Sequence, residues 1–399
     1  MRLRRRGFES YFFGTTPEKL MLEQKPVKVC LLGLENISVF INGFDHVRVG
    51  GEQVQQSLLA RALSRSGHLV SMVCMDFGQP DGTEEAGIRV YKAYAPNAGL
   101  PGVRFIYPRW IKLWCALRRA DADIYYTSCA GMQVGLLALF CQQYKRKFIY
   151  RVASDNDCNP ACLLIPLARD KYLYEYGLQH AHGVLAQSHQ QTEALERNYR
   201  RDSQVACMLV EQPSKCIPYQ ERDIDVLWVN NIRELKRPDL ALDLAESMQE
   251  ATFHLVGGPN EPRLYERVKQ RAASLKNVTF HGPVPYRRVG EFYDRCRVFL
   301  NTSDIEGFPN SYLQAWVRSR PVVAFFDPDG LIKREGMGQA VTSLVEMRMA
   351  VRSYLSNISA LEDVGERCRE YMSKKYDDDV VLQPYMQMIK RLVSQNAEF

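Results

Sequence analysis

The residue types best suited to chemistry lie in two short stretches of the C-terminal half. In the first stretch, Glu306 stands in a loop that follows the apolar run 298–300, and a helix is predicted to begin at Pro309. Proline is tolerated in a first helical turn because the N–H groups there lack intrahelical partners. Those groups and the helix dipole favour an anion or sugar oxygens. Gln314 follows Glu306 with seven residues between them, so both side chains can face one ligand held at the helix start.

The second stretch is basic and has the sequence VNNIRELKRPDL. It places Arg233, Lys236 and Arg237 immediately before Pro238, where a further helix is predicted. Positive charge is unfavourable near a helix N-terminus. A cluster of cations at this position therefore indicates a bound anion.

The first stretch resembles the donor-binding signature of family 4 (group 1) retaining glycosyltransferases, in which a Glu, seven residues and a second Glu bracket a helix N-terminus. In that family the first Glu lies near the transferred sugar and the second binds the ribose of the nucleotide. Here the two positions hold Glu306 and Gln314. Exchanging the second carboxylate for an amide is expected to cost roughly 1 to 1.5 kcal/mol, or about tenfold in donor affinity.

The second stretch resembles the basic donor motif of the same family, where an Arg and a Lys neutralise the nucleotide diphosphate. Lys236 matches the Lys, whereas Asn231 holds the usual Arg position and leaves Arg233 or Arg237 as substitutes. A fixed cation at a leaving diphosphate commonly contributes about 10² to 10³ in rate. The resemblance implies catalytic roles for Glu306, Lys236 and Arg233.

The resemblance also implies further contacts with the donor and the acceptor. Donor contacts are expected at Gly50, Gly51, Asn231, Gly282, Val284, Phe308, Pro309, Asn310, Ser311 and Gln314. The glycine pair precedes a helix, where missing side chains let a phosphate approach backbone N–H groups. Acceptor or sugar contacts are expected at Arg151, Ser154 and Asp155, which follow a predicted strand at a place where many relatives carry a His.

No metal or other cofactor is predicted, and the nucleotide-diphosphate sugar is a co-substrate. Asp-x-Asp pairs occur at residues 121–123, 155–157 and 327–329, and three copies of so short a pattern are weak evidence for a metal. A dehydrogenase is disfavoured because Gly33, after the first predicted strand, lacks the companion glycines of a dinucleotide fingerprint.

Alternating strands and helices predict an α/β protein with parallel sheets. Strands are expected at 27–32, 69–75, 89–93, 124–127, 148–152, 183–186 and 204–210 in the first half. By resemblance the fold is GT-B, with two Rossmann-like domains facing across a cleft and a C-terminal helix that crosses back to the first. We expect an N-terminal arm (1–26), an acceptor domain (27–212, with helix 377–399) and a donor domain (222–376).

Bulk properties favour a cytoplasmic globular protein, which does not bind nucleic acid. Among 399 residues the net charge is only +6, no apolar run reaches membrane-spanning length, and the 11 cysteines indicate reduced thiols. The basic and aromatic residues of the N-terminal arm, and those around Trp110 and Trp114, leave peripheral contact with the inner face of the membrane open. A loose arm and an ordinary core helix are the alternatives.

The function expected from the resemblance is transfer of a sugar, with retention, from a UDP or GDP sugar to a glycan, lipid-linked or small-molecule acceptor in polysaccharide or glycoconjugate biosynthesis. In this family the leaving phosphate is thought to take the proton of the acceptor. Asn231 and Gln314 leave open a catalytically inactive partner subunit that binds nucleotide sugar. A GT-B sugar-nucleotide epimerase is a third hypothesis.

Overall fold

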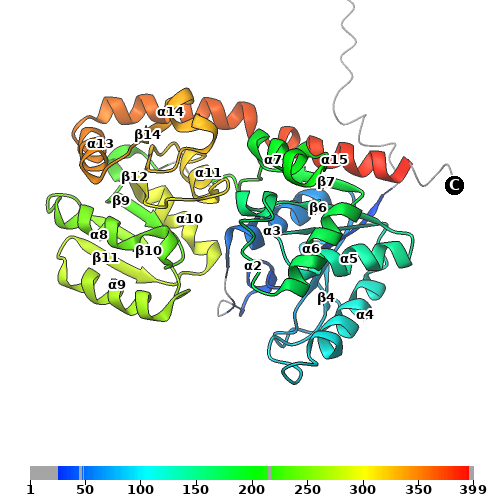
Figure 1. The fold of residues 1–399 in the computed structure, drawn as a ribbon. Helices are drawn as coiled ribbons and strands as arrows, with labels where there is room; N and C mark the ends of the chain where they lie inside the picture. Colours follow the sequence, from blue (N-terminus) through cyan, green and yellow to red (C-terminus); the bar gives the residue numbers. More distant parts are fainter. Residues whose placement is uncertain (1–25, 45–46, 48, 214–216, 395–399) are drawn as a thin grey trace, which may run out of the picture.

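The computed structural model describes residues 26–44, 47, 49–213 and 217–394. Within this part the chain forms two α/β domains side by side, each with its own sheet (Figure 1). The expected α/β class and two-domain architecture are therefore confirmed. Nearly all of the expected N-terminal arm lies outside the described residues.

The first sheet has eight strands in the order β3-β4-β2-β1-β5-β6-β7-β8. Its strands are β1 (Lys28–Leu32), β2 (Leu69–Cys74), β3 (Thr83–Glu85), β4 (Ile88–Lys92), β5 (Ile124–Ser128), β6 (Lys147–Arg151), β7 (Gly183–Ala186) and β8 (Gln204–Val205). All neighbours are parallel except the β3–β4 pair. Strands such as β1, with the sequence KVCLL, are continuously apolar because helices cover both faces of a parallel sheet.

The helices of the first domain connect these strands. They are α2 (Ile37–Phe40), α3 (Gly51–Arg65), the π-helical turn η1 (Phe105–Trp110), α4 (Ile111–Ala120), α5 (Met132–Gln143), the 3₁₀ turn η2 (Asp155–Cys158), α6 (Ala168–His180) and α7 (His189–Tyr199). On α4, Leu113 and Leu117 are buried, as the apolar stripe of that helix predicts.

The second sheet has six parallel strands in the order β11-β10-β9-β12-β13-β14. They are β9 (Ile224–Val229), β10 (Phe253–Val256), β11 (Val278–Gly282), β12 (Cys296–Asn301), β13 (Val322–Ala324) and β14 (Gly338–Ala340). Its larger helices are α8 (Pro238–Glu246), α9 (Pro262–Ser274), α10 (Tyr286–Arg295), α11 (Asn310–Trp316), α12 (Leu331–Glu335), α13 (Leu344–Ser356) and α14 (Ile358–Lys375). Three 3₁₀ turns are η3 (Tyr219–Glu221), η4 (Glu234–Lys236) and η5 (Pro328–Gly330).

The last helix, α15 (Asp378–Ser394), returns to the first domain as expected (Figure 1). Tyr385 donates a hydrogen bond to the Cys207 carbonyl over 3.2 Å, and Asp378 forms an ion pair with Arg65 of α3. Gly183 of β7 lies against Met388, and an added Cβ there would be 2.4 Å from the Met388 sulfur. The returning helix is therefore packed as part of the first domain.

The strand expected at 204–210 is wrong beyond Val205, where β8 ends. The chain that follows is buried, but a side chain takes the place of a neighbouring strand. Gln55 of α3 accepts from the Leu209 N–H over 2.9 Å and donates to the Leu209 carbonyl over 2.8 Å. A buried backbone must find hydrogen-bond partners, and here a buried glutamine supplies both.

Candidate functional site

Lys236 and Glu306 come together at the topological switch point of the second sheet. The chain moves from β9 towards β10 and β11 on one side, and from β12 towards β13 and β14 on the other. In open α/β sheets ligands bind in the crevice outside the carboxyl ends of the strands at such a point. Lys236 follows β9 and Glu306 follows β12, so sheet topology brings two residues distant in sequence to one place.

The two side chains form an ion pair that is largely shielded from solvent. Lys236 Nζ donates to Glu306 Oε2, and the exposed fractions of the side chains are 16% and 11%. Asn301, the last residue of β12, directs Nδ2 to Glu306 Oε1 at 3.4 Å. Thr302 Oγ1 donates to the Lys236 carbonyl over 2.7 Å, which ties the two loops together. The carboxylate and the cation are thus held in one fixed arrangement.

The two arginines considered as substitutes for the missing family Arg differ in their surroundings. Arg237 is paired with Asp304 and lies over the Phe325 ring, with its guanidinium carbon 5.0 Å from the ring centroid. Arg233 caps η4, is exposed, and has no carboxylate partner among the residues that the structure describes. Arg233 is therefore the better placed of the two to meet an anion.

The loop after Glu306 lies between the domains. The Phe308 N–H donates to Gln187 Oε1 over 3.1 Å, and Asn310 Nδ2 donates to the Gly51 carbonyl over 2.7 Å. Gly307 packs so tightly that an added Cβ would be 2.9 Å from the Ala153 carbonyl oxygen. The loop that carries Glu306 is thus held against the first domain.

Other contacts between the domains involve the glycine pair. Asn231 Nδ2 donates to the Val49 carbonyl over 3.1 Å, next to Gly50. Gly50 caps α3, and its N–H donates to Gln53 Oε1 over 2.9 Å. A Cβ on Gly51 would be 2.5 Å from Asn310 Nδ2, so a larger residue there would require the Asn310 side chain to shift. Asn231 and the glycine pair are brought to one interface with the Glu306 loop.

The helix after Glu306 begins one residue later than expected. Pro309 is the N-cap of α11, with φ of −72° and ψ of 117°, and the prediction that it lies in the first turn is wrong. The extended ψ angle places Pro309 outside the helix, and Asn310 and Ser311 form its first turn.

Gln314 accepts from Arg318 Nη1 over 2.7 Å, and Arg318 pairs with Asp294, so the Gln314 amide is directed along its own helix.

Gly282 and Val284 lie in the turn from β11 to α10. Gly282 has a φ of +66°, which favours glycine, and its carbonyl accepts from the Gly257 N–H over 2.9 Å. Val284 is partly buried. The turn therefore has a fixed backbone at the end of the second sheet.

The three residues expected at the acceptor lie at the end of β6 and at the start of η2. Ser154 caps η2 by accepting from the Asn156 N–H over 3.1 Å, and Asp155 accepts from Gln191 Nε2 of α7 over 2.8 Å. A shared acceptor pocket at these residues stays a prediction. Arg151 is 1% exposed, and its Nε and Nη2 atoms have no hydrogen-bond partner among the described residues.

A polar cavity of about 420 Å³ occupies the topological switch point of the first sheet, between the ends of β1 and β5. Sequence reasoning missed the residues that line it, which include Glu35, Asn36, Glu52, Gln53, Gln56, Arg109, Ser128 and Gln133. Ser128 donates to Glu52, and Gln56 Nε2 donates to Ser128 Oγ over 2.7 Å. The signal in the sequence was the largely polar stretch EQVQQS, residues 52–57, in the first turns of α3.

Burial raises the pKa of Glu52 to about 7, although the nearby Arg151 guanidinium opposes this shift. Burial likewise raises the pKa of Asp157 to about 6, against hydrogen bonds from backbone N–H groups. A carboxyl group with a pKa near neutrality can exchange a proton at physiological pH. Glu52 lines the polar cavity, so it is the titratable group best placed to meet a ligand there.

The Asp-x-Asp pairs are engaged in structural contacts. Asp121 pairs with Lys28 and Arg146, and Asp327 accepts from the N–H groups of Ile332 and Lys333. Within the described residues no three His, Cys, Asp or Glu side chains gather in a way that could hold a metal ion. The ten cysteines of the same part of the chain are all free thiols.

Each of the two domains matches the model of a known protein family. Residues 50–208 match the model described as glycosyl transferase 4-like domain, and residues 223–357 match the model described as glycosyl transferases group 1. Among curated proteins, alpha-galactosylglucosyldiacylglycerol synthase of Streptococcus pneumoniae is 26% identical over 170 residues. That match covers 42% of this chain and 45% of the relative, so it spans less than half the length of either protein.

Solved structures share the fold over nearly the whole chain. Sucrose-phosphate synthase from Thermosynechococcus elongatus has a TM-score of 0.72 at 16% identity, covering 93% of this chain and 100% of that one. A glycosyltransferase from Rickettsia africae has a TM-score of 0.67 at 14% identity, with 93% and 99% covered. WaaG, a glycosyltransferase involved in lipopolysaccharide biosynthesis, has a TM-score of 0.61 at 14% identity, with 90% and 98% covered. Because two glycosyltransferase models together match residues 50–208 and 223–357, which are most of the chain, and these structures share its two-domain architecture, the chain belongs to the group 1, or family 4, glycosyltransferases of the GT-B fold.

Proposed function

We propose that this protein transfers a sugar from a nucleotide-diphosphate sugar, of UDP or GDP type, to a hydroxyl group of an acceptor with retention of configuration. The observation that carries the proposal is the shielded Lys236–Glu306 pair at the switch point of the second sheet. Asn310, four residues after Glu306, contacts Gly51 of the first domain. The polar cavity of the first domain supplies a place for the acceptor.

Lys236 and Arg233 would hold the donor diphosphate. When the bond from the sugar to the diphosphate breaks, negative charge grows on the leaving group, and a fixed ammonium stabilises that charge. A diphosphate would compete with Glu306 for Lys236, because all of these groups are anions. The bound donor would thereby release the Glu306 carboxylate to face the sugar.

Glu306 would then stabilise the positive charge that develops at the anomeric carbon. As in the family that the sequence resembles, the leaving phosphate would take the proton of the acceptor hydroxyl, and no separate base is assigned. The proposed reaction uses no metal, and Asp121 and Asp327 are engaged with cations and backbone N–H groups.

The acceptor would be a glycan or a lipid-linked molecule used in polysaccharide or glycoconjugate assembly. Support comes from two relatives, one named for a glycosylated diacylglycerol and one for lipopolysaccharide biosynthesis. We place the reaction in the cytoplasm or at the inner face of the membrane. No helix in the described ranges has the length and apolar character needed to cross a bilayer.

The proposal is tested by screening UDP, GDP, ADP and dTDP for a rise in melting temperature, because a ligand that binds only the folded state stabilises it. Donor hydrolysis is then measured for the wild type, Glu306→Gln and Lys236→Met. Lys374→Met is the matched control, since Lys374 lies exposed on α14 and pairs only with Glu370 among the described carboxylates.

Both site variants are expected to lose most turnover while the control retains it. Near-normal turnover in both site variants would contradict the assignment of the site. Donor binding with neither hydrolysis nor transfer in the wild type would instead favour an inactive partner subunit.

A further inference from the structure

A second cavity of the first domain, of about 500 Å³, adjoins the polar cavity and has an excess of positive charge in its lining. Its charged lining residues are Arg104, Arg109, Arg169 and Asp170, which supply three guanidinium groups and one carboxylate. We name this space the arginine cavity. Arg109 and Gln133 line both cavities, so the two spaces meet at these side chains. An excess of cations around a hollow attracts an anion.

Arg109 lies at the junction of the two cavities and has hydrogen-bond donors that no protein group uses. Its Nη2 donates to the Pro96 carbonyl over 3.3 Å, and its guanidinium carbon lies 5.6 Å from the centroid of the Tyr94 ring. The Nε atom is shielded from solvent and has no hydrogen-bond partner among the described residues. A shielded donor without an acceptor costs free energy, and an oxyanion in the cavity would supply acceptors.

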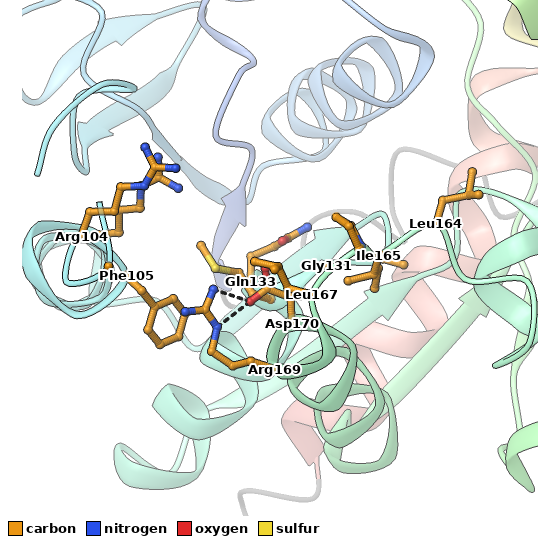
Figure 2. A pocket seen from close by; sticks show the side chains of 14 residues that line it. Arg104, Phe105, Gly131, Gln133, Leu164, Ile165, Leu167, Arg169 and Asp170 are labelled. Carbon is orange, nitrogen blue, oxygen red and sulfur yellow. Dashed lines mark hydrogen bonds and ion pairs between the residues drawn. The ribbon is translucent and has the colours of Figure 1, made fainter. Parts of the chain in front are cut away.

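The other two arginines of the cavity differ in their surroundings. Arg169 Nη2 is 2.7 Å from Asp170 Oδ1, and the Arg169 guanidinium carbon lies 3.6 Å from the centroid of the Phe105 ring (Figure 2). Asp170 therefore balances the charge of Arg169. Arg104 is exposed and forms no ion pair with a carboxylate in the described ranges. The positive charge that remains in the lining belongs to Arg104 and Arg109.

The start of α5 adds partial positive charge to the same cavity. Gly131, Met132 and Gln133, which are the N-cap and the first two residues of this 12-residue helix, all line the cavity. No side chain caps this helix start, and no acidic residue lies in its first turn. The N–H groups of a first helical turn lack intrahelical partners and, together with the helix dipole, favour an anion. Two independent features, Arg109 and the start of α5, therefore favour an anion in one space.

The polar cavity has a different lining. Its charged residues are Glu35, Glu52 and Arg109, so carboxylates outnumber cations there. Glu52, Gln56 and Ser128 form a hydrogen-bonded set of donors and acceptors, which suits the hydroxyl groups of a sugar. A molecule that filled both spaces would present hydroxyl groups at one end and an oxyanion at the other.

We propose that the acceptor carries an oxyanion, a phosphate or a carboxylate, which binds in the arginine cavity beside Arg109 and the start of α5 while a hydroxylated part lies in the polar cavity. This inference rests on the proposed function and narrows it to acceptors that carry such a group. The planar fork of a guanidinium matches two oxygens of either group. Holding the oxyanion at Arg109 would fix one end of the acceptor and so orient its hydroxyl groups.

The first test measures the affinity of the full chain for glucose 6-phosphate, glucuronate and glucose by calorimetry. At least one of the two anions is expected to bind about tenfold more tightly than glucose, because an oxyanion adds charge-assisted hydrogen bonds. This affinity should fall as salt is raised. If neither anion binds more tightly than glucose, the inference is overturned.

Variants locate the bound anion. Arg109→Gln should weaken the binding of the tighter anion about tenfold, and Arg109→Lys should restore part of the loss. Lys236→Met, which removes a cation from the proposed donor site, should bind the anion as the wild type does. Arg118→Gln is the matched control, because Arg118 is exposed on α4 and lines neither cavity. A loss in Lys236→Met but not in Arg109→Gln would place the anion in the donor site and overturn the inference.

A pair of variants at Leu167 keeps the test decisive if the Arg109 variants do not fold. Leu167 is the N-cap of α6, is 53% exposed and lines the arginine cavity. Asp and Asn are both favoured N-cap residues, so Leu167→Asp and Leu167→Asn should both fold. The Asp variant adds negative charge to the cavity and should bind the anion about tenfold more weakly than the Asn variant. Equal affinities of the two variants would count against the proposed site.

A phosphate can belong to a sugar phosphate or to a lipid headgroup, and dihexanoylphosphatidylglycerol, below its critical micelle concentration, is the probe for the second source. Tighter binding of glucose 6-phosphate would assign the phosphate to a water-soluble acceptor, and tighter binding of the lipid probe would assign it to a headgroup. Either result supports the site when Arg109→Gln weakens the binding.

Nucleotide binding separates this inference from the proposed function. If UDP or GDP binds normally and none of the anionic probes does, the inference fails and the proposed function stands. If the anionic probes bind at Arg109 but no nucleotide or nucleotide sugar binds, the proposed function fails and takes the acceptor assignment with it.

Discussion

Glu52 offers the sharpest test of the electrostatics of the polar cavity. Replacing it by Gln keeps an acceptor for the Ser128 hydroxyl and removes the only titratable group of that side chain. Burial raises the pKa of Glu52 from 4.5 to about 7, so the folded state holds a proton that the unfolded state has already released between these pH values. Stability should therefore fall as pH rises through this window.

The size of the effect follows from the two pKa values. At pH 5 the wild type keeps most of the stabilising effect of the bound proton, and at pH 8 it has lost almost all of it. Integrating the proton linkage between these limits gives about 2 to 3 kcal/mol as an upper bound. The Gln variant has no such dependence. The difference in the free energy of unfolding, variant minus wild type, should therefore rise by at most about 2 to 3 kcal/mol from pH 5 to pH 8.

The assay is urea denaturation of both proteins at pH 5, 6, 7 and 8, followed by far-UV circular dichroism. The contributions of other titrating groups to the free energy of unfolding cancel in the difference between variant and wild type. Glu35→Gln serves as the control, because Glu35 lines the same cavity but is exposed. A difference that stays constant with pH would refute the argument that burial holds Glu52 protonated.

Three further predictions concern other parts of the chain. Lys236→Met should lower turnover about 10² to 10³-fold. Adding Glu306→Gln should lower turnover by less than the product of the two single effects, because the two side chains form one ion pair. Initial rates of nucleotide release in a double-mutant cycle measure this coupling, and losses that are additive in free energy would contradict it. Gly307→Ala should displace the Glu306 loop and reduce the rate of sugar transfer about tenfold, because the new Cβ would be 2.9 Å from the Ala153 carbonyl oxygen. In the control Gly258→Ala the new Cβ makes only ordinary contacts, so this variant should transfer sugar at the normal rate. Burial, and then the nearby His281, lower the pKa of His254 to about 4, so the folded state disfavours its protonation and stability should fall as pH drops below 6.5. Urea titrations of His254→Gln should show a loss of stability between pH 7 and pH 5 that is smaller than in the wild type by about 1 to 2 kcal/mol. An unchanged loss of stability would contradict this explanation.

The sequence by itself determined the fold class and the donor half of the candidate site. Apolar runs alternating with helical periodicity predict parallel α/β domains, because strands covered on both faces must be continuously apolar. Glu306 and Lys236 stand directly after two such runs, and the carboxyl ends of parallel strands share one edge of a sheet. Their meeting was therefore predictable from local pattern and resemblance.

Only the tertiary structure decided which residues line the polar cavity of the first domain. Glu52 and Ser128 are 76 residues apart, and nothing in either local sequence indicates a hydrogen bond between them. Asp155 accepts a hydrogen bond from Gln191 of α7, and the local sequence around Asp155 does not indicate this contact either. The exposure of Leu100 and Leu164 is likewise a property of the folded chain, because periodicity shows which side chains can share a face, whereas only packing decides which face remains exposed.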